Sequence, residues 1–236
     1  MSGPTSFASE FRRGALRFVP VAISVAAYGL VWGVLAGQKG LSLAEVALMS
    51  GLVFAGASQF VALDMWQTGA LPIASIVIAT LIVNLRLVLM SATMRPLVAQ
   101  LPAWRALAAM FLVSDESWAM TMGERDRGGA GLAFFLGTGV LCWLSWLAST
   151  VIGRLIGSVI ADPTALGLDF AFTATFLALL LGMWKGRMDL VPWLVGGLVA
   201  VLVSRLVEGN WYIIAGGVAG SLAGAIVETW RQSRVA

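Results

Sequence analysis

Residues 51–66 read GLVFAGASQFVALDMW, an apolar stretch of membrane-spanning length with small and polar residues near its middle. Small residues there indicate either close helix packing or a local break in the helix that frees backbone N–H groups. Packing alone would account for Gly56, Ala57 and Ser58. It accounts less well for Gln59, because a buried side-chain amide needs several hydrogen-bond partners.

The whole composition agrees with a membrane-embedded chain. Of its 236 residues, 59% are hydrophobic and 11% are charged, whereas a soluble domain is about half apolar and about a quarter charged. Apolar runs long enough to cross a bilayer recur along the sequence, so we predict an all-α polytopic membrane protein. Several of the ten tryptophans lie near predicted span ends and are typical of interfacial belts.

Several functional classes are excluded or disfavoured. The chain has no histidine and one cysteine, Cys142, so a histidine metal site, a Ser-His protease and an internal disulfide are impossible. Common catalytic motifs such as CxxC, HExxH, the P-loop and GxSxG are absent from the sequence. A net charge of +3 on scattered basic residues does not suggest nucleic-acid binding. We therefore expect no enzyme activity, no metal and no cofactor.

The apolar segments predict eight spans, some of them discontinuous, in a single transporter domain over residues 1–236. With both termini in the cytoplasm, most arginines and lysines fall on the cytoplasmic side. Arg95 and Arg105 fall on the other side, so a seven-span arrangement remains open. The predicted spans cover residues 17–37, 43–66, 70–91, 104–122, 131–158, 168–185, 189–207 and 210–230.

Two segments suggest an internal repeat. Residues 54–66, FAGASQFVALDMW, are similar to residues 170–184, FAFTATFLALLLGMW. The corresponding halves would cover residues 14–123 and 130–230, and transporters built from such halves bind substrate at the repeat interface. Eight continuous spans would make the halves parallel, and a non-spanning segment between them would make them inverted.

A second polar stretch, residues 82–96, reads IVNLRLVLMSATMRP and places Asn84 and Arg86 within a predicted span. Arg86 can extend its charge to the membrane interface along its aliphatic stem. The alternative is a fixed cation that pairs with a substrate carboxylate or a protein acid, with Asn84 orienting it, since an ionisable residue inside a membrane usually has a function.

A third stretch, residues 105–127, has only eight apolar residues, 106–113, before Ser114-Asp115-Glu116-Ser117. Eight residues are too few to cross a bilayer, so we predict a discontinuous span with a polar joint. In one interpretation Ser114 caps the second half-helix and the two acids complement its dipole. In the other, Asp115 or Glu116 accepts a proton because desolvation disfavours its charged form.

The chain contains, in this order, VFAGASQFVAL, NLRLVLMSATMRPL, SDESWAM and GLDFAFTATFLALLL. Together these stretches resemble the AzlC family of azaleucine-resistance, branched-chain amino acid permeases, which includes YgaZ-like exporter components. The resemblance extends from about residue 14 to about residue 220. It differs at Leu87, where the family pattern usually has histidine. The resemblance implies a bacterial inner-membrane protein that exports leucine, isoleucine, valine and their analogues together with a small AzlD-like membrane protein.

Combining the resemblance with the polar stretches, we predict a proton-coupled secondary transporter. A non-transporting membrane scaffold or regulatory subunit, and a passive channel, are the alternatives. The predicted roles are carboxylate binding by Gly56, Ala57, Ser58 and Arg86, hydrogen bonding to the substrate or the joint by Gln59 and Asn84, ammonium binding or proton transfer by Asp115 and Glu116, and an apolar pocket of Phe54, Phe60 and Trp118.

Overall fold

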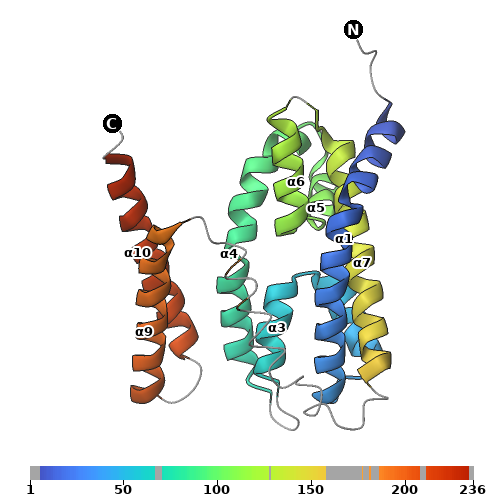
Figure 1. Ribbon diagram of the computed structural model, residues 1–236. Helices are drawn as coiled ribbons and strands as arrows, with labels where there is room; N and C mark the ends of the chain where they lie inside the picture. Colours follow the sequence, from blue (N-terminus) through green and yellow to red (C-terminus); the bar gives the residue numbers. More distant parts are fainter. Residues whose placement is uncertain are drawn as a thin grey trace. The chain divides into compact units, whose positions relative to one another are not determined.

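The computed structural model describes residues 6–66, 71–127, 129–157, 177, 181, 186–207 and 211–233 (Figure 1). Every secondary-structure element in these ranges is a helix, as predicted for the all-α class. The chain divides into two compact units, Met1–Leu71 with Val83–Asp169, and Pro72–Ile82 with Phe170–Ala236.

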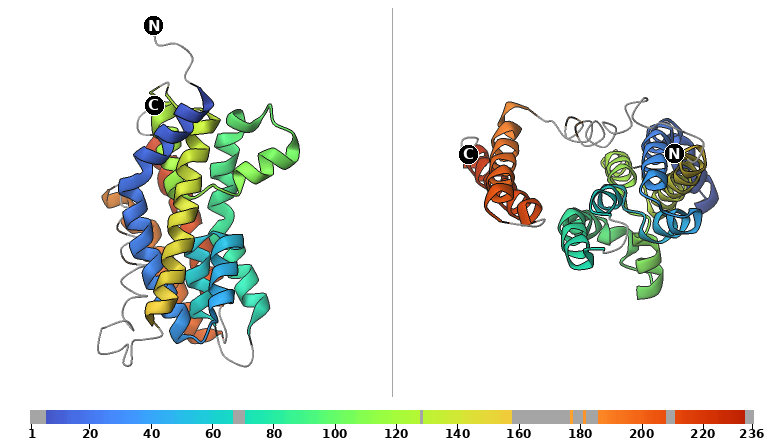
Figure 2. Two further views of the ribbon diagram at one scale, coloured as in Figure 1. Left: turned by 90° about the vertical axis from the view of Figure 1, so that its right-hand side faces the viewer. Right: turned by 90° about the horizontal axis from the view of Figure 1, so that it is seen from below.

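The first unit is built around two long helices that run side by side, α1 and α7 (Figures 1 and 2). Ser6 caps α1 by accepting a hydrogen bond from the amide of Ser9 at 3.3 Å, so the helix begins well before the predicted start at residue 17. The described elements of this unit are α1 (Phe7–Gln38), α2 (Leu43–Leu48), the π-helix η1 (Met49–Val53), α3 (Gly56–Asp64), residues 83–98 of α4 (Ile73–Val98), α5 (Ala103–Met110), α6 (Asp115–Arg125) and α7 (Leu132–Gly157).

Glycines allow α1 and α7 to approach each other closely. A Cβ atom on Gly33 of α1 would collide with the backbone of α7 at Thr150, and one on Gly153 of α7 would collide with the backbone of α1 at Leu30. Small residues are the usual means of close helix packing in membranes, where van der Waals contact replaces the hydrophobic effect between helices. The interface between α1 and α7, called the glycine seam below, therefore depends on close contact between the two backbones.

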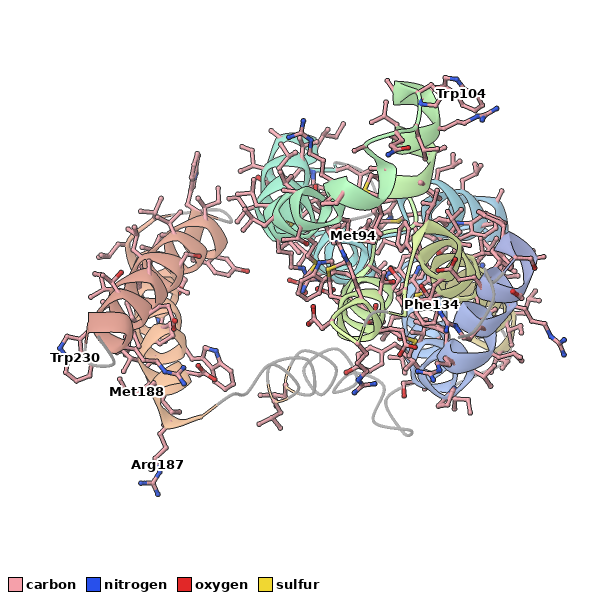
Figure 3. All side chains as sticks on the ribbon, turned by 90° about the horizontal axis from the view of Figure 1, so that it is seen from above. Met94, Trp104, Phe134, Arg187, Met188 and Trp230 are labelled. Carbon is pink, nitrogen blue, oxygen red and sulfur yellow. The ribbon has the colours of Figure 1, made fainter. Side chains whose placement is uncertain are left out.

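Large side chains fill the rest of the first unit. Phe18 and Trp32 of α1, and Phe134 and Phe135 of α7, are fully buried. A second cluster joins the end of α4 to α5 and α7 through the buried side chains of Met94, Val98, Ala109, Val113 and Phe135. Figure 3 shows Met94 and Phe134 among the helices of this unit, whereas Trp104 stands at its edge.

Three contacts attach the end of α6 and the connection from α6 to α7 to the beginning of α1. Arg17 pairs with Glu124 at 2.5 Å, Glu10 accepts a hydrogen bond from the amide of Gly131, and Arg13 donates to the carbonyl of Gly129. Glu124 is 8% exposed, so its charge needs a partner, and Arg17 supplies it.

The second unit contains residues 73–82 of α4, the short η3 (Arg187–Asp189), α9 (Leu190–Leu206) and α10 (Trp211–Ser233). Helices α9 and α10 also pack through glycines: a Cβ atom on Gly196 would lie 3.0 Å from the carbonyl oxygen of Gly216. Arg187, Met188 and Trp230 project from the outside of this unit (Figure 3).

Four described helices are long and apolar enough to cross a membrane: Phe7–Gln38, Ile73–Val98, Leu132–Gly157 and Arg187–Leu206. The predicted spans 43–66 and 104–122 are each broken into shorter helices, and the predicted span 210–230 corresponds to α10. The predicted span 168–185 and most of the second copy of the repeat lie outside the described residues. The eight-span count and the two halves therefore remain predictions.

The glycine seam can be tested by adding one methyl group. Gly33→Ala should destabilise the protein by about 1–3 kcal/mol, because the new Cβ forces α1 and α7 apart. Gly123→Ala is the matched control, because among the described residues no atom outside its own stretch of helix backbone lies within 4 Å of its Cβ position and alanine favours a helix by about 1 kcal/mol over glycine. Thermal unfolding in detergent measures both, and equal midpoints for the two variants would contradict the seam.

Candidate functional site

The first helix break lies at Phe54 and Ala55, between η1 and α3. Phe54 adopts the left-handed conformation, with φ 46° and ψ 48°, which costs a non-glycine residue about 1–2 kcal/mol. Gly56 then begins α3, so the predicted break is confirmed but lies just before the Gly-Ala-Ser step. Such backbone strain tends to occur at functional sites.

The beginning of α3 exposes backbone donors. The first backbone bond into this helix runs from the amide of Gln59 to the carbonyl of Ala55 at 2.9 Å. The amides of Gly56, Ala57 and Ser58 precede it and have no partner within the helix. Among the described residues no side chain caps α3. This helix end carries partial positive charge and suits an anion.

Gln59 holds the break together. Its side chain is completely buried. Its Nε2 donates to the hydroxyl of Ser50 at 3.2 Å, and its Oε1 accepts from the indole of Trp146 at 2.9 Å. Trp143 supports the same region by donating to the carbonyl of Gly51 at 3.0 Å. The amide therefore joins η1, α3 and α7. Of the two roles predicted for Gln59, this geometry favours holding the joint.

Asn84 connects α4 to the first break. The hydroxyl oxygen of Ser58 lies 3.0 Å from the side-chain oxygen of Asn84 and 3.0 Å from the carbonyl oxygen of Ala55. Ser58 is buried, whereas Asn84 is half-buried. The two polar residues predicted on separate stretches are thus in direct contact.

The second break separates α5 from α6. Ser114 accepts from the amide of Ser117 at 3.2 Å, and Ser117 accepts from the amide of Ser114 at 2.9 Å, which forms a reciprocal cap. Asp115 and Glu116 occupy the first turn of α6. The helix break and the capping role of Ser114 are confirmed, and the proton-accepting role of the two acids remains a prediction.

Arg86 pairs with Asp115, so α4 also connects to the second break. Its Nη2 lies 2.8 Å from the carboxylate oxygen, and the two side chains are 35% and 40% exposed. The Nε atom of Arg86 is buried and has no hydrogen-bond partner among the described residues. Of the alternatives for Arg86, the structure shows pairing with a protein acid. Because Asn84 and Arg86 are two residues apart, one segment of α4 contacts both breaks.

The aromatic residues divide between two places. Phe54 and Phe111, one from each break, pack with ring centroids 6.0 Å apart. Trp118 instead packs against the cluster around Met94 and donates to the hydroxyl of Thr93 at 2.8 Å. Phe60 is buried at 1% exposure. The structure thus joins Phe54, Ser58, Asn84, Arg86 and Asp115 in one group, and it places Trp118 in the cluster around Met94.

Glu116 lies in the first turn of α6, a helix that packs against the two central helices α1 and α7. It lies close enough to Tyr28 of α1 and Cys142 of α7 to interact with both electrostatically. The hydroxyl of Ser114 is 3.5 Å from the sulfur of Cys142. The second break is therefore next to α1 and α7 as well as α4.

Sequence reasoning missed the partners of the predicted residues. Trp146 is 6% exposed and packs against Trp32 at a ring distance of 6.4 Å, so these two tryptophans belong to the core of the first unit. One signal was available: Trp143 and Trp146 are three residues apart within an apolar run, which places both indoles on one helix face. Ser50 and Phe111 carried no comparable signal.

Comparisons with known proteins agree with the membrane character of the chain. A family model described as AzlC protein matches residues 20–160. An uncharacterized membrane protein of Archaeoglobus fulgidus is 31% identical over 92% of this chain and 95% of its own length. The inner membrane protein YgaZ of Escherichia coli is 28% identical over 97% and 95%. The branched-chain amino acid transport protein AzlC of Bacillus subtilis is 26% identical over 87% and 80%. No solved structure gives a significant match.

The joint held by Gln59 can be tested by a double-mutant cycle. Gln59→Leu leaves the indole of Trp146 and the hydroxyl of Ser50 unpaired, and should cost about 1–3 kcal/mol of stability. Trp146→Phe should cost a similar amount, since it leaves the amide oxygen unpaired. The double variant should lose about 0.5–3 kcal/mol less than the sum. Thermal unfolding in detergent measures the coupling.

The control cycle pairs Gln59→Leu with Trp104→Phe. Trp104 is 66% exposed, so its effect should add to that of Gln59→Leu without coupling. Additive behaviour in both cycles would show that the Trp146–Gln59 bond does not support the joint.

Proposed function

Because the chain belongs to the AzlC family, we propose that it is an inner-membrane secondary transporter that exports the branched-chain amino acids leucine, isoleucine and valine. The relative from Bacillus subtilis is named a branched-chain amino acid transport protein, and the relative from Escherichia coli an inner membrane protein. The proposal includes a small AzlD-like membrane protein as partner and both termini in the cytoplasm.

The observation that carries this proposal is the half-exposed ion pair between Arg86 and Asp115. An amino acid at neutral pH is a zwitterion with one carboxylate and one ammonium group. Arg86 binds the carboxylate and Asp115 binds the ammonium, so one internal ion pair is replaced by two pairs with the substrate. The exchange leaves no charge unpaired, which matters because an uncompensated charge away from water is costly.

The carboxylate end of this site also includes the beginning of α3. The amides of Gly56, Ala57 and Ser58 have no partner within their helix, and the helix dipole favours an anion there. Asn84 contacts Ser58 and precedes Arg86 by two residues, so it orients the carboxylate between them. Gln59 fixes the backbone of the break through its hydrogen bonds to Ser50 and Trp146.

The side-chain pocket needs a different conformation. Phe54 and Phe60 are buried at 6% and 1% exposure, and Trp118 is held by Thr93. In the proposal these aromatic residues line a pocket for a branched aliphatic side chain once the helix breaks rearrange. Broken helices are a common means of such movement in secondary transporters.

Proton coupling is assigned to the acids of the second break. Asp115 exchanges its arginine partner for the substrate ammonium, and Asp115 or Glu116 carries the proton. Both acids lie in the first turn of α6, and Asp115 is the ion-pair partner of Arg86, so the substrate ammonium and the proton compete for the same carboxylates.

The test is efflux of labelled leucine and valine from cells that express the chain with its partner. Arg86→Gln and Asp115→Asn should each lower efflux about tenfold or more, because each variant leaves one charge of the pair without its partner. Arg231→Gln is the matched control, since it removes a charge at the end of α10 in the second unit. Immunoblots of the membrane fraction measure abundance.

The acid role has its own readout. At equal abundance of the protein in the membrane, at least one of the two variants Glu116→Gln and Asp115→Asn should change how efflux depends on the proton gradient. Unchanged efflux in both variants would refute the assignment of the proton or the ammonium to these acids.

A second candidate function is a non-transporting subunit that scaffolds its partner. It is favoured by the contacts of Gln59, Ser58 and Ser117, whose side chains all bond to other protein groups and thus resemble polar glue between helices. Counterflow of leucine into liposomes separates the two functions. Activity with the partner alone would favour the scaffold, and activity that needs this chain and its Arg86 would favour the transporter.

A further inference from the structure

The outer face of α1 has a basic hollow near its beginning. The hollow has a volume of about 390 Å³ and is open to the surroundings (the start of α1 is blue in Figure 1). Its lining contains three cations and no carboxylate. The lining residues are Ser9, Arg12, Arg13, Leu16 and Arg17.

The guanidinium groups of this hollow retain unused donors. Arg13 lines the hollow, donates to the carbonyl of Gly129 through one guanidinium nitrogen and lies 5.4 Å from the ring centroid of Phe134. The side chain of Arg17 remains 52% exposed although it pairs with Glu124. Arg12 is exposed. Arginine donors arranged in this way suit the oxygens of a phosphate group.

The acids near the hollow are already engaged. Glu10 accepts from the amide of Gly131, and Glu124 pairs with Arg17 and lies 3.9 Å from Arg127. Glu10 thus satisfies a backbone group of the connection between α6 and α7, and Glu124 of α6 balances Arg17 of α1. Arg12 and the unused donors of Arg13 and Arg17 are left to attract an anion.

An apolar stripe continues from the hollow along the same helix face. Leu16, Val19 and Ile23 are 59%, 46% and 70% exposed. They follow Arg12 at intervals of four, three and four residues, which places all four side chains on one side of α1. A free phosphate ion would make no favourable contact with this apolar stripe, whereas the acyl chain of a lipid would pack along it.

We propose that this face of α1 binds one phospholipid with an anionic headgroup. The phosphate occupies the hollow between Arg12, Arg13 and Arg17, and one acyl chain follows Leu16, Val19 and Ile23. Basic pockets at the ends of membrane helices recognise anionic lipids in this manner.

The experiment measures lipid binding to the purified full chain in a neutral detergent by native mass spectrometry. Phosphatidylglycerol, phosphatidylcholine with matched acyl chains, and inorganic phosphate are the three probes. Phosphatidylglycerol should bind most tightly, and inorganic phosphate should neither bind nor compete. Arg12→Gln should weaken phosphatidylglycerol binding about fivefold, since one arginine at a lipid surface contributes about that factor.

Two further variants complete the test. Arg12→Lys should retain most of the binding, because the positive charge remains. Arg231→Gln, which removes an arginine from α10, should bind the lipid as the unchanged chain does. Equal affinity for the two lipids, competition by inorganic phosphate, or equal behaviour of Arg12→Gln and Arg231→Gln would each overturn the proposal.

Discussion

A polar group without a partner in hydrocarbon costs several kcal/mol, and the segment from Leu43 to Asp64 meets this constraint at its break. The left-handed turn at Phe54 interrupts the backbone ladder between η1 and α3. Gln59 then bonds to both Ser50 and Trp146, and Trp143 takes the carbonyl of Gly51. Helix α7 thereby supplies the partners that the broken helix lacks, and α7 is itself held against α1 by glycine contacts.

Helix α4 contacts both helix breaks. Asn84 reaches Ser58 at the start of α3, and Arg86 reaches Asp115 at the start of α6. Both contacts are made at helix beginnings, where backbone amides carry partial positive charge. The cation of Arg86, the anion of Asp115 and the beginnings of α3 and α6 therefore all lie near one short segment of α4. This arrangement resembles, in its physical parts, the broken-helix binding sites of secondary transporters.

The two breaks were predictable from residue types alone. Eight apolar residues before Ser114 cannot span a bilayer, and a Ser-Asp-Glu-Ser sequence is a strong helix start, so the second joint was apparent in the chain. The first break was indicated by the Gly-Ala-Ser-Gln group, although its position differed by a residue or two because Phe54, and not a glycine, adopts the left-handed conformation. The sixth predicted span, 168–185, and most of the second repeat copy lie outside the described residues.

Composition, apolar runs and local capping signals therefore indicate a helical membrane protein with two helix breaks, because these properties depend on neighbours along the chain. The pairing of Arg86 with Asp115, the contact of Ser58 with Asn84 and the burial of Gln59 against Trp146 appear only in the folded chain. Each contact joins two residues that lie on separate helices, and the hydrogen-bonded pairs are 26 and 87 positions apart. Helix packing therefore selects the partner. An ionisable residue in an apolar run shows that a partner is needed, and only the tertiary structure decides which one it is.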